Sequence, residues 1–460
     1  MRTYLLFILS VLHIQFMHGQ IFPVETIKNS GDNDKRINLV ILGDGYQTSE
    51  LDQFETDAID FMNALFLLSP FTEYEDYFNV HIINVPSNES GASHPGTASD
   101  EHLYSVPVST VDNYFGSSYD SFGIHRLLYT PNSALISTVL ANNFPTYDVG
   151  FLLVNAPYYG GSGGMFPIAS TGEFAEGIAI HELGHTFSEL QDEYWPGIAI
   201  ASEAKNMTQD SDPATIRWKN WLGTNGVGIY AYSTSGVPST WFRPHQSCIM
   251  RSVENPYCSV CIEGLLETIH SLVSPIDSYT PANATLMNPA FPMDFQLNLI
   301  EPMPNTLENT WTLNSSPFEV NMDMVTIEES DLNTGSNELS VVVIDATTLI
   351  NIDNYSSINF HTITWTIENT LGVQDIEENQ YDIKMYPNPA NNLIHFSMNN
   401  SMGETVRVEI ISVDGKQVAS LDLINGQVTP FDISNLSQGI YVVHFYNDET
   451  PLLNRKLVKN

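Results

Sequence analysis

The chain of 460 residues carries 16 Lys and Arg against 54 Asp and Glu, a formal net charge of −38. This excess of negative charge disfavours binding to nucleic acid or to anionic membrane surfaces. Hydrophobic residues make up 42% and aromatic residues 11% of the chain. Global disorder is therefore excluded, and the length predicts about two to four packed domains.

The first 19 residues predict a secretory signal peptide. Arg2 precedes an apolar run over 4–12, and the small Gly19 precedes the predicted mature start at Gln20. That run is too short to span a membrane, and no later stretch approaches about 18 uninterrupted apolar residues. We expect an exported protein without a transmembrane segment.

The segment that follows is predicted to have an α/β arrangement. The apolar run over 37–42 predicts a strand, and the apolar spacing over 49–67 predicts a helix. Further strands are expected at 78–85 and 149–155. The glycines at 43 and 45 lack both the third glycine of a dinucleotide fingerprint and the lysine of a P-loop, which disfavours nucleotide binding.

Residues 181–185 read His-Glu-Leu-Gly-His, an HExxH motif within a segment of helical apolar spacing. Four residues make about one helical turn, so His181 and His185 project from one face and can bind one metal ion. Glu182 lies beside them and is placed to take a proton from a zinc-bound water and deliver it to a leaving amine. The motif predicts Zn²⁺ as cofactor and Glu182 as catalytic residue.

A catalytic zinc ion needs a third protein ligand, and Glu189, Asp192 and Glu193 follow the motif. On a continuous helix Asp192 would lie about 10 Å beyond His185 along the axis. A chain that breaks after Leu190 and folds back would bring Asp192 to the metal. We expect Asp192 as third ligand, with Glu193 as the alternative.

The only cysteines, Cys248, Cys258 and Cys261, are close together in the sequence. Their number excludes a disulfide framework, and a four-ligand zinc knuckle would need a second Cys pair nearby. Because export favours oxidation, we expect one local disulfide between Cys248 and one of the other two.

Between Arg251 and Lys384 there is no Lys or Arg. Alternating apolar residues at 338–344 and 363–367 predict a small β-sandwich over 276–372, with a domain boundary near Pro275 and a polar linker over 373–383. The carboxylates of this region leave structural Ca²⁺ open, although no EF-hand-like loop is present.

Alternating short strands over 384–460 predict a further small β-sandwich. The order of YPNP at 386–389, DGK at 414–416, GIY at 439–441 and a basic final LVK at 457–459 resembles the C-terminal sorting domain of the bacterial type IX secretion system. The resemblance implies export through the periplasm of a Gram-negative bacterium. It also implies the type IX machinery as a partner and a secreted or cell-surface location.

The stretch HELGHTFSELQDEY at 181–194 resembles the signature of the M64 family of metallopeptidases, which includes bacterial IgA peptidases and belongs to the metzincin-like zinc enzymes. Related marks extend over 38–272. The chain departs from the metzincin pattern HExxHxxGxxH/D, since Ser188 replaces the glycine and the acidic residue comes one position late. The resemblance implies a metallopeptidase domain over 20–275, with Met250 as the Met-turn residue beneath the metal.

The resemblance implies one candidate substrate-binding segment, and the general chemistry of zinc sites suggests further candidates. The glycine-rich run before the active-site helix, with Gly161, Ser162 and Gly163, would receive an extended substrate backbone. Tyr194 and His245 are candidate hydrogen-bond donors to the developing oxyanion. Arg243 is a candidate partner for a substrate carboxylate, without a catalytic role.

Together these features predict a secreted zinc-dependent endopeptidase acting on a protein or peptide, such as a host or dietary protein. The expected fold is an α/β (α+β) metzincin-like domain followed by two small all-β sandwiches. Two alternatives remain open. One is a catalytically inactive surface adhesin or glycan-binding protein on this scaffold, which the intact Glu182 argues against; the other is a zinc aminopeptidase with Glu193 as third ligand.

Overall fold

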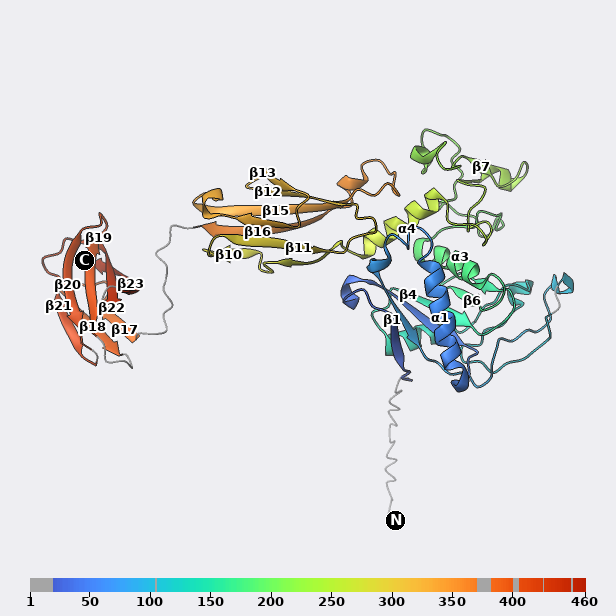
Figure 1. The fold of residues 1–460 in the computed structure, drawn as a ribbon, viewed down its shortest axis with the longest axis horizontal. Helices are drawn as coiled ribbons and strands as arrows, with labels where there is room; N and C mark the ends of the chain where they lie inside the picture. Colours follow the sequence, from blue (N-terminus) through green and yellow to red (C-terminus); the bar gives the residue numbers. More distant parts are fainter. Residues whose placement is uncertain (1–19, 104–105, 370–381, 400–404, 425, 448–449) are drawn as a thin grey trace, which may run out of the picture. The chain divides into compact units, whose positions relative to one another are not determined.

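The computed structural model describes residues 20–103, 106–369, 382–399, 405–424, 426–447 and 450–460 (Figure 1). The predicted signal peptide and most of the predicted linker lie outside these residues. The chain separates into two compact units. The first comprises the described residues up to Ala284 with Pro292–Ile327 and Glu338–Trp365, and the second comprises Thr285–Phe291, Glu328–Asn337 and the described residues after Trp365.

A six-stranded sheet in the order β1-β3-β2-β4-β6-β5 forms the centre of the first unit. Strands β2, β3, β4 and β6 run parallel, whereas β1 and β5 pair antiparallel at the two edges. All eight residues of β2 are buried, as expected for a parallel strand covered on both faces. The strands are β1 (Val24–Lys28), β2 (Ile37–Asp44), β3 (Phe78–Ile83), β4 (Val149–Val154), β5 (Gly161–Ser162) and β6 (Ile168–Ser170).

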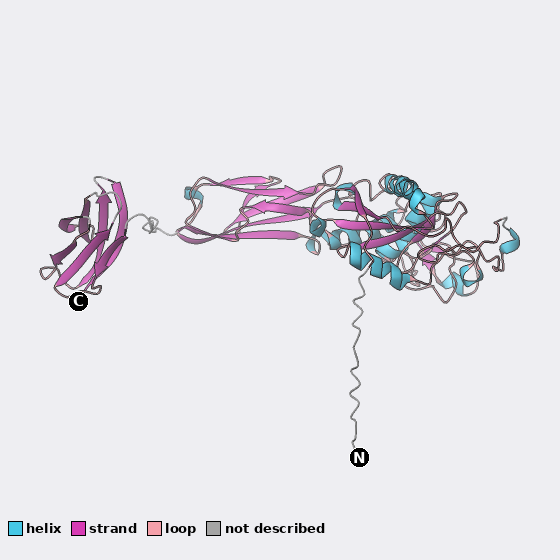
Figure 2. Ribbon diagram, turned by 90° about the horizontal axis from the view of Figure 1, so that it is seen from below, coloured by secondary structure: helices cyan, strands magenta, loops and turns pink. Residues whose placement is uncertain are grey.

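Helices cover both faces of this sheet (Figures 1 and 2). Successive residues of a strand point to opposite faces, so Ile41 of β2 packs in the core with α1, α3 and α4, while Val40 packs in the core with α2. The predicted helix over 49–67 and the strands over 37–42, 78–85 and 149–155 are confirmed. The helices are α1 (Leu51–Leu65), α2 (Ser133–Asn143), α3 (Ala175–Ser188) and α4 (Ser259–Leu272).

Long loops with short 3₁₀ helices connect these elements and carry one small two-stranded sheet. The sheet pairs β7 (Tyr230–Ala231) with β8 (Phe242–Arg243). Among the described residues, no helix is both long enough and apolar enough to span a membrane. The 3₁₀ helices are η1 (Asn33–Lys35), η2 (Thr48–Glu50), η3 (Glu75–Tyr77), η4 (Glu101–Leu103), η5 (Ser121–Gly123), η6 (Lys219–Trp221), η7 (Val237–Thr240), η8 (Glu329–Asp331) and η9 (Tyr355–Ser357).

The region after α4 is all β, with strands that alternate buried and exposed residues. In the first unit Trp311 and Trp365 stack with ring centroids 5.8 Å apart, and Phe295 packs edge-on against Trp365. This alternation is typical of a sandwich with one buried face per sheet. The strands are β9 (Ile276–Thr280), β10 (Thr285–Met287), β11 (Met293–Leu299), β12 (Leu307–Leu313), β13 (Ser316–Val320), β14 (Met324–Ile327), β15 (Gly335–Asp345) and β16 (His361–Asn369).

A buried carboxylate, Asp345, links β15 to the α/β region of the first unit. One of its oxygens accepts hydrogen bonds from the Tyr74 hydroxyl at 2.6 Å and from His270 Nε2 at 3.1 Å, and the other accepts from the Thr306 hydroxyl at 2.6 Å. Burial alone would raise the pKa of Asp345, but the hydrogen bonds from His270, Thr306 and Tyr74 outweigh it and hold the pKa below its usual value. The ionised carboxylate is therefore the form that the fold stabilises.

We expect Asp345→Asn to lower the free energy of unfolding by about 2–3 kcal/mol at pH 7, because charged hydrogen bonds are lost in a buried site. The folded pKa lies below the unfolded value of about 3.9, so this contribution is present above that pH and is lost as the pH falls through the folded pKa. Denaturant unfolding at pH 7 and near pH 3 measures the free energy of unfolding of the unaltered protein and of the Asp345→Asn variant. The difference between the two values should be smaller near pH 3. Asp353→Asn, which alters a solvent-exposed ion pair with Lys219, is the control; an equal effect of both substitutions would contradict the prediction.

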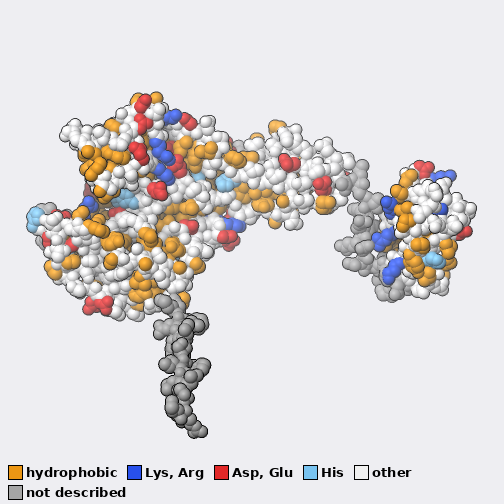
Figure 3. Space-filling model, turned by 180° about the vertical axis from the view of Figure 1, so that it is seen from behind, with side chains coloured by type: hydrophobic (Ala, Val, Ile, Leu, Met, Phe, Trp, Pro, Cys, Tyr) orange, Lys and Arg blue, Asp and Glu red, His pale blue; other side chains and the backbone are white. Residues whose placement is uncertain are grey.

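The described residues from 382 onwards form two antiparallel sheets, in the orders β17-β18-β21 and β20-β19-β22-β23. Phe396 and Phe445 meet in the core of this region. Six of the chain's sixteen Lys and Arg but only seven of its 54 Asp and Glu lie within 384–460. Several basic side chains of this region are visible on the face of the molecule that Figure 3 shows. The strands are β17 (Asp382–Tyr386), β18 (Leu393–Asn399), β19 (Val406–Ser412), β20 (Gln417–Leu423), β21 (Val428–Asp432), β22 (Gly439–Asn447) and β23 (Thr450–Lys459).

Candidate active site

Helix α3 carries the HExxH motif and turns both of its histidines to one side. His181 Nε2 and His185 Nε2 lie 3.2 Å apart. The other nitrogen of each ring is hydrogen-bonded to a backbone carbonyl, His181 Nδ1 to Ile249 at 2.9 Å and His185 Nδ1 to Leu190 at 2.6 Å. A ring that donates its Nδ1 hydrogen presents a lone pair at Nε2, which is the orientation of a metal ligand.

The chain reverses direction immediately after this helix. Helix α3 ends at Ser188, and Glu189 adopts a left-handed conformation with φ of 56°. The amides of Glu189 and Leu190 donate to the carbonyls of His185 and Gly184, at 3.0 and 3.2 Å, and close the helix as a C-cap. The predicted break thus exists, two residues before the expected place, and it returns the next residues towards the histidines.

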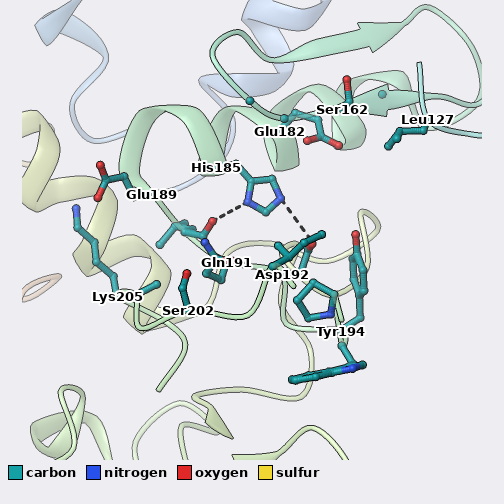
Figure 4. Close-up of a pocket in the computed structure, with 18 of the residues that line it drawn as sticks. Leu127, Ser162, Glu182, His185, Glu189, Gln191, Asp192, Tyr194, Ser202 and Lys205 are labelled. Atoms are coloured by element: carbon teal, nitrogen blue, oxygen red, sulfur yellow. Dashed lines mark hydrogen bonds and ion pairs between the residues drawn. The ribbon is translucent and has the colours of Figure 1, made fainter. Parts of the chain in front are cut away.

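Asp192 faces His185 from the returning chain (Figure 4). Its Oδ1 lies 3.2 Å from His181 Nε2 and 3.3 Å from His185 Nε2. A tetrahedral ion bound at about 2.0–2.1 Å holds its ligand atoms about 3.3–3.4 Å apart. The three side chains together fit a zinc ion and leave one coordination position for water.

The electrostatics of the three side chains are coupled. Burial alone would lower the pKa of His185, but the hydrogen bond and negative charge of Asp192 raise it to about 9. Burial would raise the pKa of Asp192, yet the two histidines hold it well below its usual range. Without a cation the pair therefore favours imidazolium and carboxylate, and an arriving metal ion must displace the His185 proton.

Glu182 projects from the same helix into a cleft of about 1490 Å³. Burial raises the pKa of Glu182, with smaller opposing contributions from the charges of His181 and His185. Tyr194 also lines the cleft, and its ring lies parallel to that of His181 with centroids 6.5 Å apart. The Arg126 guanidinium lies 5.9 Å from the Tyr194 ring centroid. Arg126 was not a sequence candidate, since no motif surrounds it.

Met250 lies directly against the HExxH helix. It is fully buried, and its Sδ lies 2.9 Å from the position that a Cβ would take on Gly184. The Tyr257 hydroxyl lies at the same distance from that position, so no side chain fits there. The glycine of the motif therefore allows the loop that carries Met250 to approach the helix closely.

The glycine-rich run lies beside Glu182. Strand β5 is an edge strand, but the Gly161 amide donates to the Arg126 carbonyl at 3.2 Å, and the Ser162 hydroxyl donates to the Leu128 carbonyl at 2.6 Å. The outer edge of β5 is thus partly occupied by the chain itself. At Gly163 a Cβ would lie 3.0 Å from Glu182 Oε2. Of the three predicted residues Gly161, Ser162 and Gly163, it is therefore Gly163 that lies against the Glu182 carboxylate.

Comparison with known families adds to this geometry. Residues 25–231 match the family model described as IgA Peptidase M64. The chain carries an M64 peptidase domain. Residues 384–460 match the model of the secretion system C-terminal sorting domain. Both resemblances seen in the sequence are confirmed: an M64 domain implies a peptidase with protein substrates, and the sorting domain indicates type IX export to the cell surface or beyond.

No curated protein sequence matches this chain. Among solved structures, latent PorU from Porphyromonas gingivalis is 15% identical, with 40% of this chain and 20% of PorU covered at a TM-score of 0.15. The fibronectin(III)-like modules of Clostridium thermocellum CbhA are 12% identical, with 40% and 93% covered at 0.16. Parabacteroides merdae β-glucuronidase is 10% identical, with 71% and 45% covered at 0.16. The chain thus spans a fifth of PorU, and these TM-scores carry no conclusion about its fold or activity.

Glu193 of the M64 domain points away from the histidines that its neighbour Asp192 contacts. Its Oε1 lies 3.3 Å from Cys261 Sγ and 3.7 Å from Cys258 Sγ, in a fully buried position. The alternative with Glu193 as third ligand is not supported.

The predicted disulfide is also absent from the structure. All three cysteines are free, and the Cys248 and Cys261 sulfurs lie 3.7 Å apart, compared with about 2.05 Å in a disulfide.

His245 and Arg243 take structural places in a loop of the M64 domain. His245 Nδ1 accepts a hydrogen bond from the Ser247 amide at 2.9 Å, and its ring lies against Gly226. Arg243 Nε donates to the His245 carbonyl, and its guanidinium lies 5.0 Å from the Tyr232 ring centroid. The structure therefore does not bring His245 to the metal ligands as a substrate-binding group. Tyr232, which the sequence did not single out, donates to the Asp192 carbonyl at 2.7 Å and supports the ligand loop.

Gly163→Val should lower kcat/KM of the M64 domain by about a hundred-fold. A side chain there would displace the Glu182 carboxylate, and misplacement of a reacting group by about 1 Å costs rates of this order. Steady-state kinetics on a fluorogenic peptide measures the effect, and zinc content and thermal unfolding show whether the variant remains folded. Unchanged kcat/KM in a folded variant would mean that Gly163 lies outside the reacting region.

Proposed function

We propose that the protein is a secreted zinc-dependent endopeptidase on a metzincin-like scaffold. His181, His185 and Asp192 hold the zinc ion, Glu182 is the general base and Met250 is the Met-turn residue. The observation that carries the proposal is the convergence of three candidate ligand atoms within 3.3 Å of one another, beside the half-buried Glu182 carboxylate in an open cleft.

Zinc, when bound, lowers the pKa of a coordinated water towards 7 and polarises the scissile carbonyl. The Glu182 carboxylate accepts the proton of the attacking water and delivers it to the nitrogen of the leaving amine. Because burial raises the pKa of Glu182, its protonated form is easier to reach than that of an exposed glutamate. The same residue can therefore act first as base and then as acid.

In this proposal Tyr194, which lines the cleft, donates a hydrogen bond to the carbonyl oxygen as negative charge develops on it. Burial raises the pKa of its hydroxyl well above neutrality, so the hydroxyl keeps its proton. The nearby Arg126 guanidinium contributes positive potential on the same side of the cleft. Preorganised donors of this kind stabilise the transition state more than the bound substrate.

We expect Tyr194→Phe to lower kcat about ten- to hundred-fold with a small change in KM, because the lost bond forms mainly in the transition state. Steady-state kinetics on one fluorogenic peptide separates the two parameters. Tyr230→Phe, which removes a hydroxyl bonded to the Gly226 carbonyl, is the matched control. A rise in KM at constant kcat would instead assign Tyr194 to ground-state binding.

The dimensions of the cleft favour an extended peptide substrate. Its volume of about 1490 Å³ exceeds the roughly 300–1,000 Å³ of small-molecule sites. The glycine-rich run and the loop from Gln191 to Lys205 both contribute to its lining. An endopeptidase that accepts a long backbone, from a host or dietary protein, fits such a cleft better than an aminopeptidase.

The deciding experiment uses the chain from Gln20 onwards with an unfolded protein substrate and a peptide whose amino terminus is blocked. Cleavage of both that stops on chelation and returns with zinc supports an endopeptidase. Cleavage that requires a free amino terminus supports the aminopeptidase. A folded, zinc-loaded protein that cleaves neither substrate favours the adhesin alternative.

A further inference from the structure

A second group of potential metal ligands lies next to the candidate active site. Glu193, Cys248, Cys258 and Cys261 come from three separate segments, all are buried, and their donor atoms lie within 4.8 Å of one another. We propose that these four side chains bind a structural zinc ion. This site is distinct from the histidine site, because Glu193 and Asp192 face in different directions from adjacent positions.

The distances agree with tetrahedral coordination. Zinc–sulfur bonds of about 2.3 Å place two sulfurs about 3.8 Å apart, and a zinc–oxygen bond of about 2.0 Å places oxygen about 3.5 Å from sulfur. The Cys248 and Cys261 sulfurs are 3.7 Å apart. Glu193 Oε1 lies 3.3 Å from the Cys261 sulfur and 3.7 Å from the Cys258 sulfur.

Burial and charge also favour a cation at this position. The Glu193 side chain is fully buried, and its Oε2 has no hydrogen-bond partner among the described residues. A buried ionised carboxylate surrounded by thiols is costly unless a proton neutralises it or a metal cation compensates its charge. The Cys258 amide points at the Cys248 sulfur at 3.4 Å, a contact that favours a thiolate. Thiolates with one carboxylate are a ligand set suited to zinc.

Four protein ligands without access to solvent make a closed site, which is typical of structural rather than catalytic zinc. The site would fasten the loop after α3 to the Met250 loop and to the start of α4. The Glu193 amide already donates to the Met250 carbonyl at 2.6 Å. On the proposed function, the second ion would therefore hold Asp192 and Met250 in place around the first.

Another group of potential ligands, buried except for the partly exposed Glu101, serves as a contrast. His94 Nε2 lies 3.0 Å from Glu101 and 3.4 Å from Asp120, and His125 Nδ1 lies 3.0 and 3.3 Å from the same two carboxylates. Each histidine there faces carboxylate oxygens, so the group can be satisfied by protons alone. The group of Glu193 and the three cysteines contains no side chain that could become a cation. We therefore propose the metal ion for this group.

The test measures zinc in the full chain from Gln20, purified without added reductant. The double variant His181→Ala/His185→Ala removes the histidine site and should retain about one zinc per chain. Adding Cys261→Ser to it should remove that zinc. Cobalt substituted into the double variant should show thiolate-to-metal charge-transfer absorption, which the histidine site cannot produce. A double variant without zinc would overturn the proposal, whatever the peptidase activity of the unaltered protein.

A thiol titration avoids dependence on the folding of any variant. In denaturant with a chelator, the unaltered chain should show three reactive thiols. Under native conditions, a mercurial reagent that consumes those thiols should release one zinc equivalent per chain from the unaltered protein. The Glu182→Gln variant should release the same amount. A single reactive thiol would show a disulfide and would overturn the metal site. Three thiols without zinc release would overturn it as well.

Discussion

Glu182→Gln is expected to lower kcat by about a thousand-fold or more, since loss of a positioned general base costs roughly 10²–10⁴. The ligand atoms of His181, His185 and Asp192 are untouched, so zinc content should remain unchanged. Single-turnover hydrolysis of a fluorogenic peptide, with metal analysis of the same sample, separates the loss of chemistry from the loss of metal.

The matched control for this substitution is Glu176→Gln, at an exposed position in the first turn of the same helix. It makes the same chemical change away from the cleft and should keep nearly full activity. Equal activity of the Glu182 variant and the unaltered protein would remove the proposed mechanism. Loss of zinc in the Glu182 variant would instead assign that residue to the metal site.

Asp192→Ala is expected to weaken zinc binding by more than the 10–100-fold typical of lost outer-shell partners, because it removes a proposed direct ligand. Activity at limiting zinc should fall in parallel. Competition with a fluorescent chelator measures the affinity. The structural reason is that Asp192 Oδ1 lies within 3.3 Å of both histidine nitrogens.

Glu189→Gln is the control for Asp192, since Glu189 is an exposed acid at the reversal of the chain. Its substitution should leave zinc affinity nearly unchanged. If Asp192→Ala kept full affinity for zinc in the histidine site, the third ligand would have to be sought elsewhere.

Local patterns in the sequence predicted the elements that hold the site. The continuous apolar run of β2 and the spacing of Phe54, Ala58, Phe61 and Leu65 in α1 reflect burial, so these elements could be inferred without a structure. The HExxH spacing likewise fixes two histidines on one face. The observed fold is mixed α and β, as expected, whereas its metzincin-like character remains part of the proposal.

The position of Asp192 shows how a departure from a family pattern can have a simple physical origin. In the pattern HExxHxxGxxH/D a glycine precedes the third ligand by three positions. Here the left-handed turn residue is Glu189, one position after Ser188, and Asp192 follows it by three. The turn and the proposed ligand have moved together by one residue, so the spacing of three between them is kept.

Contacts between distant segments could not be inferred in the same way. Arg126 approaches Tyr194, and Tyr232 supports the Asp192 backbone, only because long loops bring them there. The cysteines appeared to be disulfide partners because the sequence does not show that Glu193 lies among them. His245 lay near the motifs in sequence, yet its ring is directed to Gly226.

The uneven distribution of charge along the chain offers a way to detect loss of the 384–460 region. The 384–460 region is nearly neutral, with six Lys and Arg against seven Asp and Glu. A chain cut ahead of this region would lose 77 residues but only one unit of negative charge. The shorter product would carry more charge per residue, so it should be retained longer on an anion-exchange column than its precursor.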